Sequence, residues 1–253
     1  MTDLHIHILP GLDDGADSWE DALEMAQMAV ESGVEIMAAT SHANLPEGNR
    51  KQYRESERYL GVLEQFQKLL AREKIPLRVC GGMEIFAVGD YLERLLKGEL
   101  LTLNQTSYVL AEFPMDCQAA MIYRAVQQME QAGYRPVLAH PERYLCVQQV
   151  PAHVYEWYTM GAVIQMNKGS LLGRFGERSR RTADSLLRHG LVCAAASDAH
   201  RPYIRTPRLE ELWETLADRY GERTAWLLLE ENPARILAGR SIRKEQPLPY
   251  DYS

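Results

Sequence analysis

Residues 3–15, DLHIHILPGLDDG, place two histidines one residue apart in a short apolar segment. Alternate side chains of a β-strand point to the same face, so His5 and His7 are predicted to share one face while apolar neighbours fill the other. The Asp-Asp-Gly turn follows closely enough for Asp14 to reach the same end of the strand. Taken alone, the stretch is either a half-buried strand with two incidental imidazoles or one wall of a metal site.

The rest of the chain alternates short apolar runs with longer amphipathic ones, which is the pattern of repeated βα units. Several short runs are almost continuously apolar, as expected of strands covered on both faces. The predicted strands are Asp3–His7, Val34–Thr40, Leu77–Val79, Tyr108–Phe113, Pro136–His140, Val163–Asn167 and Leu191–Ser197. Seven such units without a linker predict an α/β fold with one closed or nearly closed barrel. We expect a single domain, residues 1–241, followed by a loose tail, 242–253.

The predicted helices carry end signals. Ser18 precedes Asp21 by three residues, which is the spacing of a capping box. In the closing ENPARILAG, Asn232 is predicted to cap a helix that Gly239 ends. The other predicted helices are 49–72, Cys117–Gln131, Ala152–Met160, Glu177–His189, Leu209–Arg219 and Glu222–Leu229.

Charge, hydropathy and cysteine content argue against several classes of protein. The formal net charge of −7 argues against general nucleic-acid binding, which needs a basic surface. No apolar run approaches the roughly 18 residues of a membrane helix, and the N-terminus lacks signal-peptide features. Four cysteines lie far apart without a C-x-x-C pair, which suits free thiols in a reducing compartment. We therefore expect a cytoplasmic protein that does not insert into a membrane.

Imidazoles and carboxylates gather where the predicted strands end. In parallel barrels these ends converge on one rim, so ligands from distant parts of the sequence meet there. The candidate ligands are His5, His7, Asp14, His42, Glu84, Glu112, His140, Asp198 and His200. This set lacks thiolates and suits Zn²⁺, Mn²⁺ or Fe²⁺. Nine ligands exceed what one ion can use, so two or three metals sharing carboxylates are expected.

Each of these motifs taken singly is common by chance, but the combination is not. Five of the seven histidines fall at predicted strand ends. Of the other two, His189 lies at a helix C-terminus, where a cation is favoured, and His153 lies in a helix start.

At these residues the sequence resembles the PHP (polymerase and histidinol phosphatase) superfamily. More closely, it resembles the bacterial manganese-dependent protein-tyrosine phosphatases of capsule and exopolysaccharide operons. The resemblance runs from DLHIHILPGLDDG through TSHAN, GGMEI, AEFP, AHPERY and ASDAH to NPARIL, nearly the whole chain. It implies a distorted (β/α)₇ barrel holding a cluster of three metals, most simply Mn²⁺, with Fe or Zn as alternatives.

The resemblance also implies roles for individual residues. One ion would take His5, His7, Glu84 and Asp198; a second would take Glu84, Glu112 and His140; a third would take Asp14, His42 and His200. Arg143 in HPERY and Arg205 in HRPYIR match the phosphate-binding arginines of the family. The loop after ASDAH, which carries Arg205, is short and differs from that of the relatives.

The expected reaction is hydrolysis of phosphotyrosine by a metal-activated hydroxide held against the phosphate. Thiol-based phosphatases need Cys-x₅-Arg, and no cysteine here has an arginine at that offset, so a cysteine nucleophile is excluded. The resemblance implies a phosphotyrosine protein as substrate, in particular an autophosphorylated bacterial tyrosine kinase that controls polysaccharide synthesis.

Three alternatives to a tyrosine phosphatase stay open. The first is a histidinol-phosphate phosphatase, which would use the same metals. The second is a metal-dependent amidohydrolase, whose barrel also starts with H-x-H but usually adds a bridging lysine after its fourth strand. The third is a regulatory module that binds metal without turnover. The basic stretch 168–181 is either an attractor for acidic substrates or a solvated helix face. Tyr250 and Tyr252 near the end of the chain are possible phosphorylation targets, and the oligomeric state is left undetermined.

Overall fold

Seven parallel strands form one sheet whose spatial order follows the sequence from β1 to β7 in the computed structural model, which describes residues 1–46 and 55–250. The strands are β1 (Thr2–Ile6), β2 (Ile36–Ala43), β3 (Arg78–Phe86), β4 (Tyr108–Glu112), β5 (Arg135–Ala139), β6 (Val163–Asn167) and β7 (Ala194–Ala196). A bridge between Ile6 and Ala199 and the hydrogen bond from His7 N to Ala199 O (2.9 Å) join the first strand to the chain after the last. The sheet is therefore a nearly closed barrel, and the predicted fold class is confirmed.

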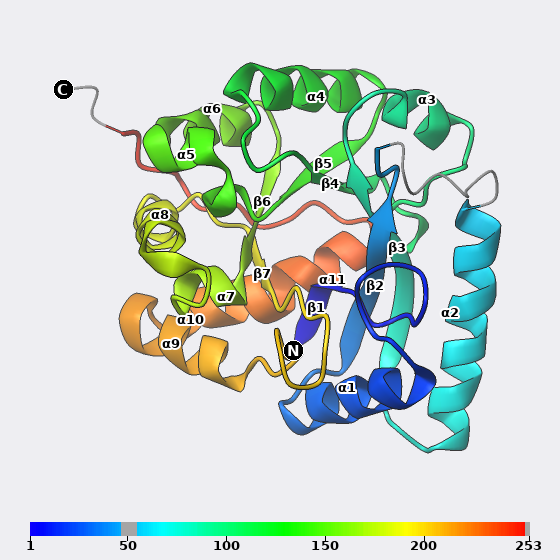
Figure 1. The fold of residues 1–253 in the computed structure, drawn as a ribbon. Coiled ribbons are helices and arrows are strands. Elements are labelled where there is room, and N and C mark those ends of the chain that lie inside the picture. The colour runs from blue at the N-terminus through cyan, green and yellow to red at the C-terminus, as the bar shows by residue number, and fades with distance from the viewer. Residues whose placement is uncertain (47–54, 251–253) are drawn as a thin grey trace.

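Helices surround this barrel on its outer side (Figure 1). They are α1 (Trp19–Glu31), α2 (Glu55–Arg72), α3 (Tyr91–Leu96), α4 (Ala119–Gln131), α5 (Leu145–Gln149), α6 (Ala152–Thr159), α7 (Lys168–Leu171), α8 (Gly176–Arg188), α9 (Glu210–Tyr220), α10 (Glu222–Trp226) and α11 (Asn232–Leu237), with short 3₁₀ turns η1 (Leu103–Gln105) and η2 (Pro141–Arg143) and a π-helical turn η3 (Leu227–Glu231). Because helices cover its outer face and side chains fill its interior, β1, β4 and β6 are almost wholly buried, as their apolar sequences predict.

Two strands are longer than predicted. β2 continues to Ala43 and β3 to Phe86, so His42 and Glu84 lie within strands rather than beyond them. The pair Gly81-Gly82 resembles a turn signal, but here it permits close packing. A Cβ on Gly82 would lie 2.8 Å from Leu103 Cδ2, and one on Gly81 would lie 3.0 Å from Leu63 Cδ2.

The predicted helix ends are partly right. Ser18 caps α1 and accepts a hydrogen bond from Asp21 N (3.1 Å), as predicted. Asn232 is not a cap, because α10, η3 and α11 continue through it in helical conformation. Its buried amide instead donates to Cys193 O and Arg243 O, 2.9 Å each, and binds the helix to the barrel. Residues 49–54 of the predicted second helix lie outside the described residues.

The chain after α11 crosses the amino-terminal end of the barrel, opposite the predicted site. Tyr108 Oη donates to Arg240 O (2.9 Å), Tyr158 Oη to Glu245 O (2.8 Å) and Leu248 N to His189 O (2.9 Å). The Tyr250 ring stacks on His189 at 3.8 Å between centroids. This part of the tail is therefore held in place and is not loose as expected; Tyr252 lies outside the described residues. Within the described parts of the chain, no helix has both the length and the apolar character needed to span a bilayer.

Candidate metal centre

All nine predicted ligands meet at the carboxyl-terminal rim of the barrel. Their ligand atoms form four overlapping groups, each within 4.8 Å: His7, Asp14, His42 and His200; His5, His7 and Glu84; His5, His140 and Asp198; His42, Glu84 and Glu112. The barrel brings them together because they stand on, or follow, six of its strands: β1, β2, β3, β4, β5 and β7. These groups overlap the three ligand sets that the resemblance implies without matching them one for one.

Glu84 is the centre of the cluster. Its Oε2 atom lies 3.1 Å from His5 Nε2, 3.2 Å from His7 Nε2 and 3.1 Å from His42 Nδ1. Its Oε1 atom lies 3.1 Å from His140 Nε2. Glu84 Oε2 and His42 Nδ1 are buried and form no hydrogen bond with any described residue. Buried polar atoms that face one another without hydrogen bonds are what a metal cluster would satisfy.

In His5 and His7, the ring nitrogen that points away from the cluster, Nδ1, forms a hydrogen bond to a neighbouring side chain. His5 Nδ1 lies 2.9 Å from Gln165 Oε1, and His7 Nδ1 lies 2.7 Å from Asp13 Oδ2; both oxygens accept. In the neutral ring, the Nδ1 proton then leaves the Nε2 lone pair free. The two Nε2 atoms lie 3.2 Å apart and face Glu84, so two lone pairs converge on one point. Imidazoles oriented from behind in this way are typical of metal ligands, and the donor set therefore fits divalent cations.

The clustered side chains shift one another's pKa, some upward and some downward. Burial would raise the pKa of Glu84, but the neighbouring His5 and His42 outweigh it and hold that pKa well below its usual range. Burial would also raise the pKa of Asp198, but the neighbouring His5 charge outweighs it, and that pKa lies well below its usual range. Burial and the His7 charge lower the pKa of His200 to about 3. At neutral pH Glu84 and Asp198 are thus ionised and His200 is unprotonated, the forms that bind a cation. The neighbouring carboxylates raise the pKa of His5, His7 and His42 despite burial, so a cation that binds these imidazoles must displace their protons.

Asp14 marks the mouth of the site. Its side chain is 68% exposed, and its Oδ1 lies 3.5 Å from His200 Nε2 and 3.7 Å from His42 Nε2. Both predicted arginines reach the same mouth. Arg143 Nη1 lies 3.4 Å from Asp198 Oδ2, and Arg205 pairs with the same oxygen through Nη2.

Three site residues have left-handed backbone conformations that non-glycine residues rarely adopt. They are His140 (φ 37°), Asp198 (φ 49°) and Arg205 (φ 55°). Such conformations concentrate at functional sites, where the surrounding structure enforces them. His140 and Asp198 follow the ends of β5 and β7 and face the cluster, and Arg205, in the loop after β7, pairs with Asp198.

Sequence reasoning missed the residues behind the ligands. Asp13 was treated only as part of a turn, yet its buried carboxylate accepts from His7, from His42 N (2.8 Å) and from Gly15 N (2.9 Å). Gln165 holds His5, and Asn167 Nδ2 donates to Asp198 Oδ2. The available signal was a pair of amides, Gln165 and Asn167, spaced by two on an otherwise apolar strand.

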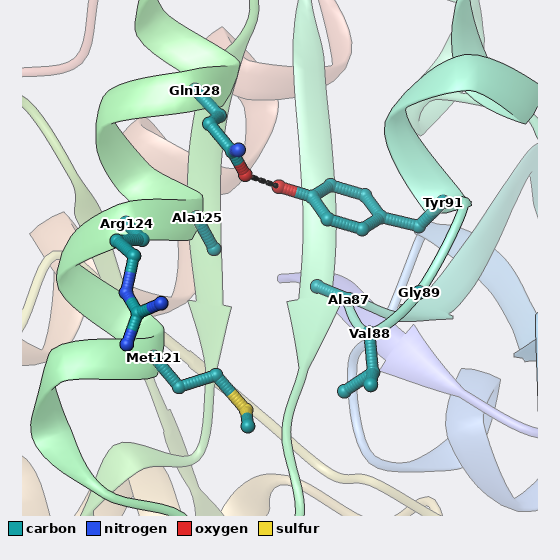
Figure 2. A pocket seen from close by; sticks show the side chains of 8 residues that line it. All are labelled: Ala87, Val88, Gly89, Tyr91, Met121, Arg124, Ala125 and Gln128. Carbon is teal, nitrogen blue, oxygen red and sulfur yellow. Dashed lines mark hydrogen bonds between the residues drawn. The ribbon is translucent and has the colours of Figure 1, made fainter.

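A shallow groove lies beside this rim, between α4 and the loop after β3 (Figure 2). It has a volume of about 240 Å³ and an apolar floor that includes Ala87 and Ala125. Tyr91 Oη donates to Gln128 Oε1 (3.3 Å) at one end. Ala87 N donates to Glu112 O (2.8 Å), so the groove wall is joined to a strand that carries a predicted ligand.

Comparison with known proteins shows which family the chain belongs to. A family model described as "Capsular polysaccharide synthesis, CpsB/CapC" matches residues 1–238. The chain belongs to the CpsB/CapC family. Within the family it is 35% identical to the tyrosine-protein phosphatase YwqE of Bacillus subtilis, over 98% of this chain and 96% of that protein. It is 30% identical to the tyrosine-protein phosphatase CpsB of Streptococcus pneumoniae, over 96% of this chain and all of that protein.

A solved structure of these relatives shares the fold. A crystal structure from a study of YwqE and CpsB, described there as unique metal-dependent tyrosine phosphatases, superposes with a TM-score of 0.92 at 35% identity and covers 99% of this chain and 100% of that one. A phosphotriesterase homology protein from Escherichia coli superposes with a TM-score of 0.62 at 12% identity, over 93% of this chain and 98% of that one, which shows a shared fold alone. The resemblance to the capsule-type phosphatase family is thus confirmed.

Proposed function

We propose that this chain is a metal-dependent protein-tyrosine phosphatase. The observation that carries the proposal is the convergence of all nine predicted ligands, with two arginines, at one rim of the barrel. The family relatives named tyrosine-protein phosphatases support the choice of phosphotyrosine over other phosphate esters. We propose the nine residues as ligands of a cluster of three ions, with Mn²⁺ as the native metal.

The metal ligands and the two arginines would have different roles in hydrolysis. Divalent metals held there would supply an activated water and neutralise charge on the phosphoryl group. The planar guanidinium groups of Arg143 and Arg205 would grip phosphoryl oxygens through paired N–H donors, which a lysine cannot reproduce. The mouth beside Asp14 would admit a phosphotyrosine side chain while its peptide remains outside. The four cysteines take no part.

The capsular-polysaccharide description of the family supports a narrower substrate. We propose a tyrosine-phosphorylated bacterial kinase of polysaccharide synthesis, reached in the cytoplasm. This part of the proposal is tested by adding the purified phosphorylated kinase and following its phosphotyrosine content.

Metal content and substrate choice test the main proposal. The protein would be stripped with chelator, reloaded with Mn²⁺, Fe²⁺, Zn²⁺ or Mg²⁺, and tested on a phosphotyrosine peptide, a phosphoserine peptide and histidinol phosphate. We expect about three bound ions and preferential hydrolysis of the phosphotyrosine peptide with Mn²⁺. Preference for histidinol phosphate would identify the alternative phosphatase. Metal binding without turnover of any substrate would identify a regulatory module.

A variant of the central carboxylate sharpens this test. Glu84→Gln removes the charge that faces four imidazoles and is expected to lower kcat/KM by about a thousandfold or more. Glu35→Gln, an exposed glutamate just before β2, is the matched control and is expected to change nothing. Equal activity of the two variants would refute the assignment of the site.

A further inference from the structure

The proposed function does not use the basic stretch 168–181 that the sequence analysis singled out. Most of its basic side chains are paired with a glutamate or buried. Arg174 pairs with Glu211 at 2.5 Å, and Arg180 and Arg181 both pair with Glu177, at 2.7 and 2.8 Å. Lys168 is buried. The stretch is therefore a poor attractor for acidic substrates, and its one aromatic residue points to a different role.

Phe175, in the turn between α7 and α8, contacts both predicted phosphate-binding arginines. The guanidinium carbon of Arg143 lies over its ring, 4.5 Å from the centroid, and that of Arg205 lies 5.5 Å from it. Both distances are within the range of cation–π attraction. One arginine comes from η2 and the other from the loop after β7, so Phe175 bridges two segments that are far apart in the sequence.

We propose that Phe175 is a positioning residue that sets the spacing and orientation of the Arg143 and Arg205 guanidinium groups for phosphate. This inference rests on the proposed function, because it assumes that these arginines bind a phosphoryl group.

The chemistry of the contact suits that task. A ring face attracts a guanidinium without using its in-plane N–H donors, so these stay free for phosphate oxygens. The other group shared by both arginines, the Asp198 carboxylate, accepts from those donors and is itself a proposed metal ligand. Phe175 is thus the shared contact that does not compete with the substrate.

The fold fixes the Phe175 ring from below. A Cβ on Gly169 would lie 2.6 Å from Phe175 Cε2, so the ring packs directly on the backbone of α7. Arg174 N donates to Gly169 O (2.8 Å), which closes the turn that delivers the ring. Because only glycine leaves room at position 169, a larger residue there would displace the ring.

The same stretch is tied to both arginine-bearing segments. Lys168 Nζ donates to Thr206 O and, at 2.7 Å, to Arg208 O, in the loop that carries Arg205. Gln148 Nε2 donates to Ser179 Oγ of α8 and to Glu142 O of η2, 3.1 Å each. Residues 168–179 therefore act as one support under the phosphate-binding side of the mouth.

Two substitutions at one position test the proposal. Phe175→Leu keeps the apolar contact with Gly169 but removes the ring face, whereas Phe175→Tyr keeps the ring face. With Mn²⁺-loaded protein and a phosphotyrosine peptide, we expect the leucine variant to raise KM and the inhibition constant of inorganic phosphate about tenfold, because two partly exposed cation–π contacts are lost. We expect the tyrosine variant to stay within about twofold of the wild type, and Mn²⁺ affinity to be unchanged in both.

A spectroscopic readout separates positioning from general stability. Protons over a ring face are shifted upfield in NMR spectra, so the side-chain N–H signals of Arg143 and Arg205 should move downfield in Phe175→Leu and not in Phe175→Tyr. Gly169→Ala should move them too, with Phe175 still present. This measurement needs neither activity nor metal, and it also decides the outcome if the leucine variant is too unstable for kinetics.

Three outcomes would overturn the proposal. The first is a folded Phe175→Leu variant with wild-type KM and phosphate inhibition. The second is an equally large rise in KM when Phe175→Leu is added to a variant in which Arg143 and Arg205 are both alanine, since the effect would then not depend on these arginines. The third is unchanged arginine signals. If the wild type hydrolyses no phosphotyrosine, the proposed function fails separately, and calorimetric binding of inorganic phosphate to the two variants still decides whether Phe175 positions the arginines.

Discussion

His7 and Asp13 form a buried pair in which Nδ1 and Oδ2 lie 2.7 Å apart, behind the metal-facing side of the imidazole. Burial would lower the pKa of His7, but the Asp13 charge outweighs it and raises that pKa well above its usual value. The same carboxylate accepts from the backbone N–H of His42, so one side chain orients two predicted ligands. Asp13 is therefore part of the site although it does not face the cluster.

Replacing Asp13 by Asn should weaken metal binding without touching a ligand. Loss of such an outer partner typically costs 10-fold to 100-fold in metal affinity, and we expect a decrease in that range for Mn²⁺. Calorimetric titration of stripped protein with Mn²⁺ measures it. Asp218→Asn, an exposed aspartate on α9, is the control. Equal affinity of the two variants would show that Asp13 serves the turn alone.

Removing every cysteine should leave phosphatase activity intact. Cys80, Cys117 and Cys193 are buried, Cys146 is half-buried, and none is among the residues that converge on the cluster. We expect a variant with all four replaced by alanine or serine to keep kcat/KM within a few-fold once it is folded. Circular dichroism confirms folding, and turnover of a phosphotyrosine peptide gives the answer. A folded but inactive variant would revive a thiol mechanism.

The rim could be predicted from sequence because it depends on topology. Ligands such as His42 and Asp198 stand at the ends of strands that their apolar runs reveal, and parallel strands of a barrel must end on one rim. Neither the missed strand extension through Gly81-Gly82 nor the wrong cap at Asn232 altered this result. A strand boundary shifted by a few residues leaves the side chain on the same rim.

The supporting residues could not be predicted in this way. Asp13, Gln165 and Phe175 act through contacts of a few ångströms that depend on side-chain direction and on loops. Asp13 and Asp14 are neighbours of the same type, yet one is buried behind His7 and the other is exposed at the mouth. No periodicity distinguishes them, because the turn itself decides which carboxylate points inward.

Lys168 should make stability depend on alkaline pH. Burial lowers its pKa from 10.5 to about 8, so between these values the unfolded chain carries a proton that the folded chain has released. Its contribution to stability therefore rises with pH from about 8 to 10.5 and is constant below that window. We expect Lys168→Met to lose this rise when urea unfolding is compared with the wild type at several pH values. Parallel pH profiles of the two proteins would contradict the shift.

Two glycines should respond oppositely to the same substitution. A Cβ on Gly15 would overlap the carbonyl oxygen of His7 and lie 2.6 Å from its Cβ, whereas a Cβ on Gly61, on α2, would meet nothing within 4 Å. Gly15→Ala must therefore push the Asp13 turn away from His7, and we expect reduced Mn²⁺ affinity together with a loss of stability. Gly61→Ala should leave Mn²⁺ affinity unchanged and stabilise the protein by about 0.5–1 kcal/mol, because alanine loses less backbone entropy in a helix. Urea unfolding and Mn²⁺ titration of both variants measure these effects. Wild-type metal affinity in Gly15→Ala would mean that the turn and the imidazole are not held against each other.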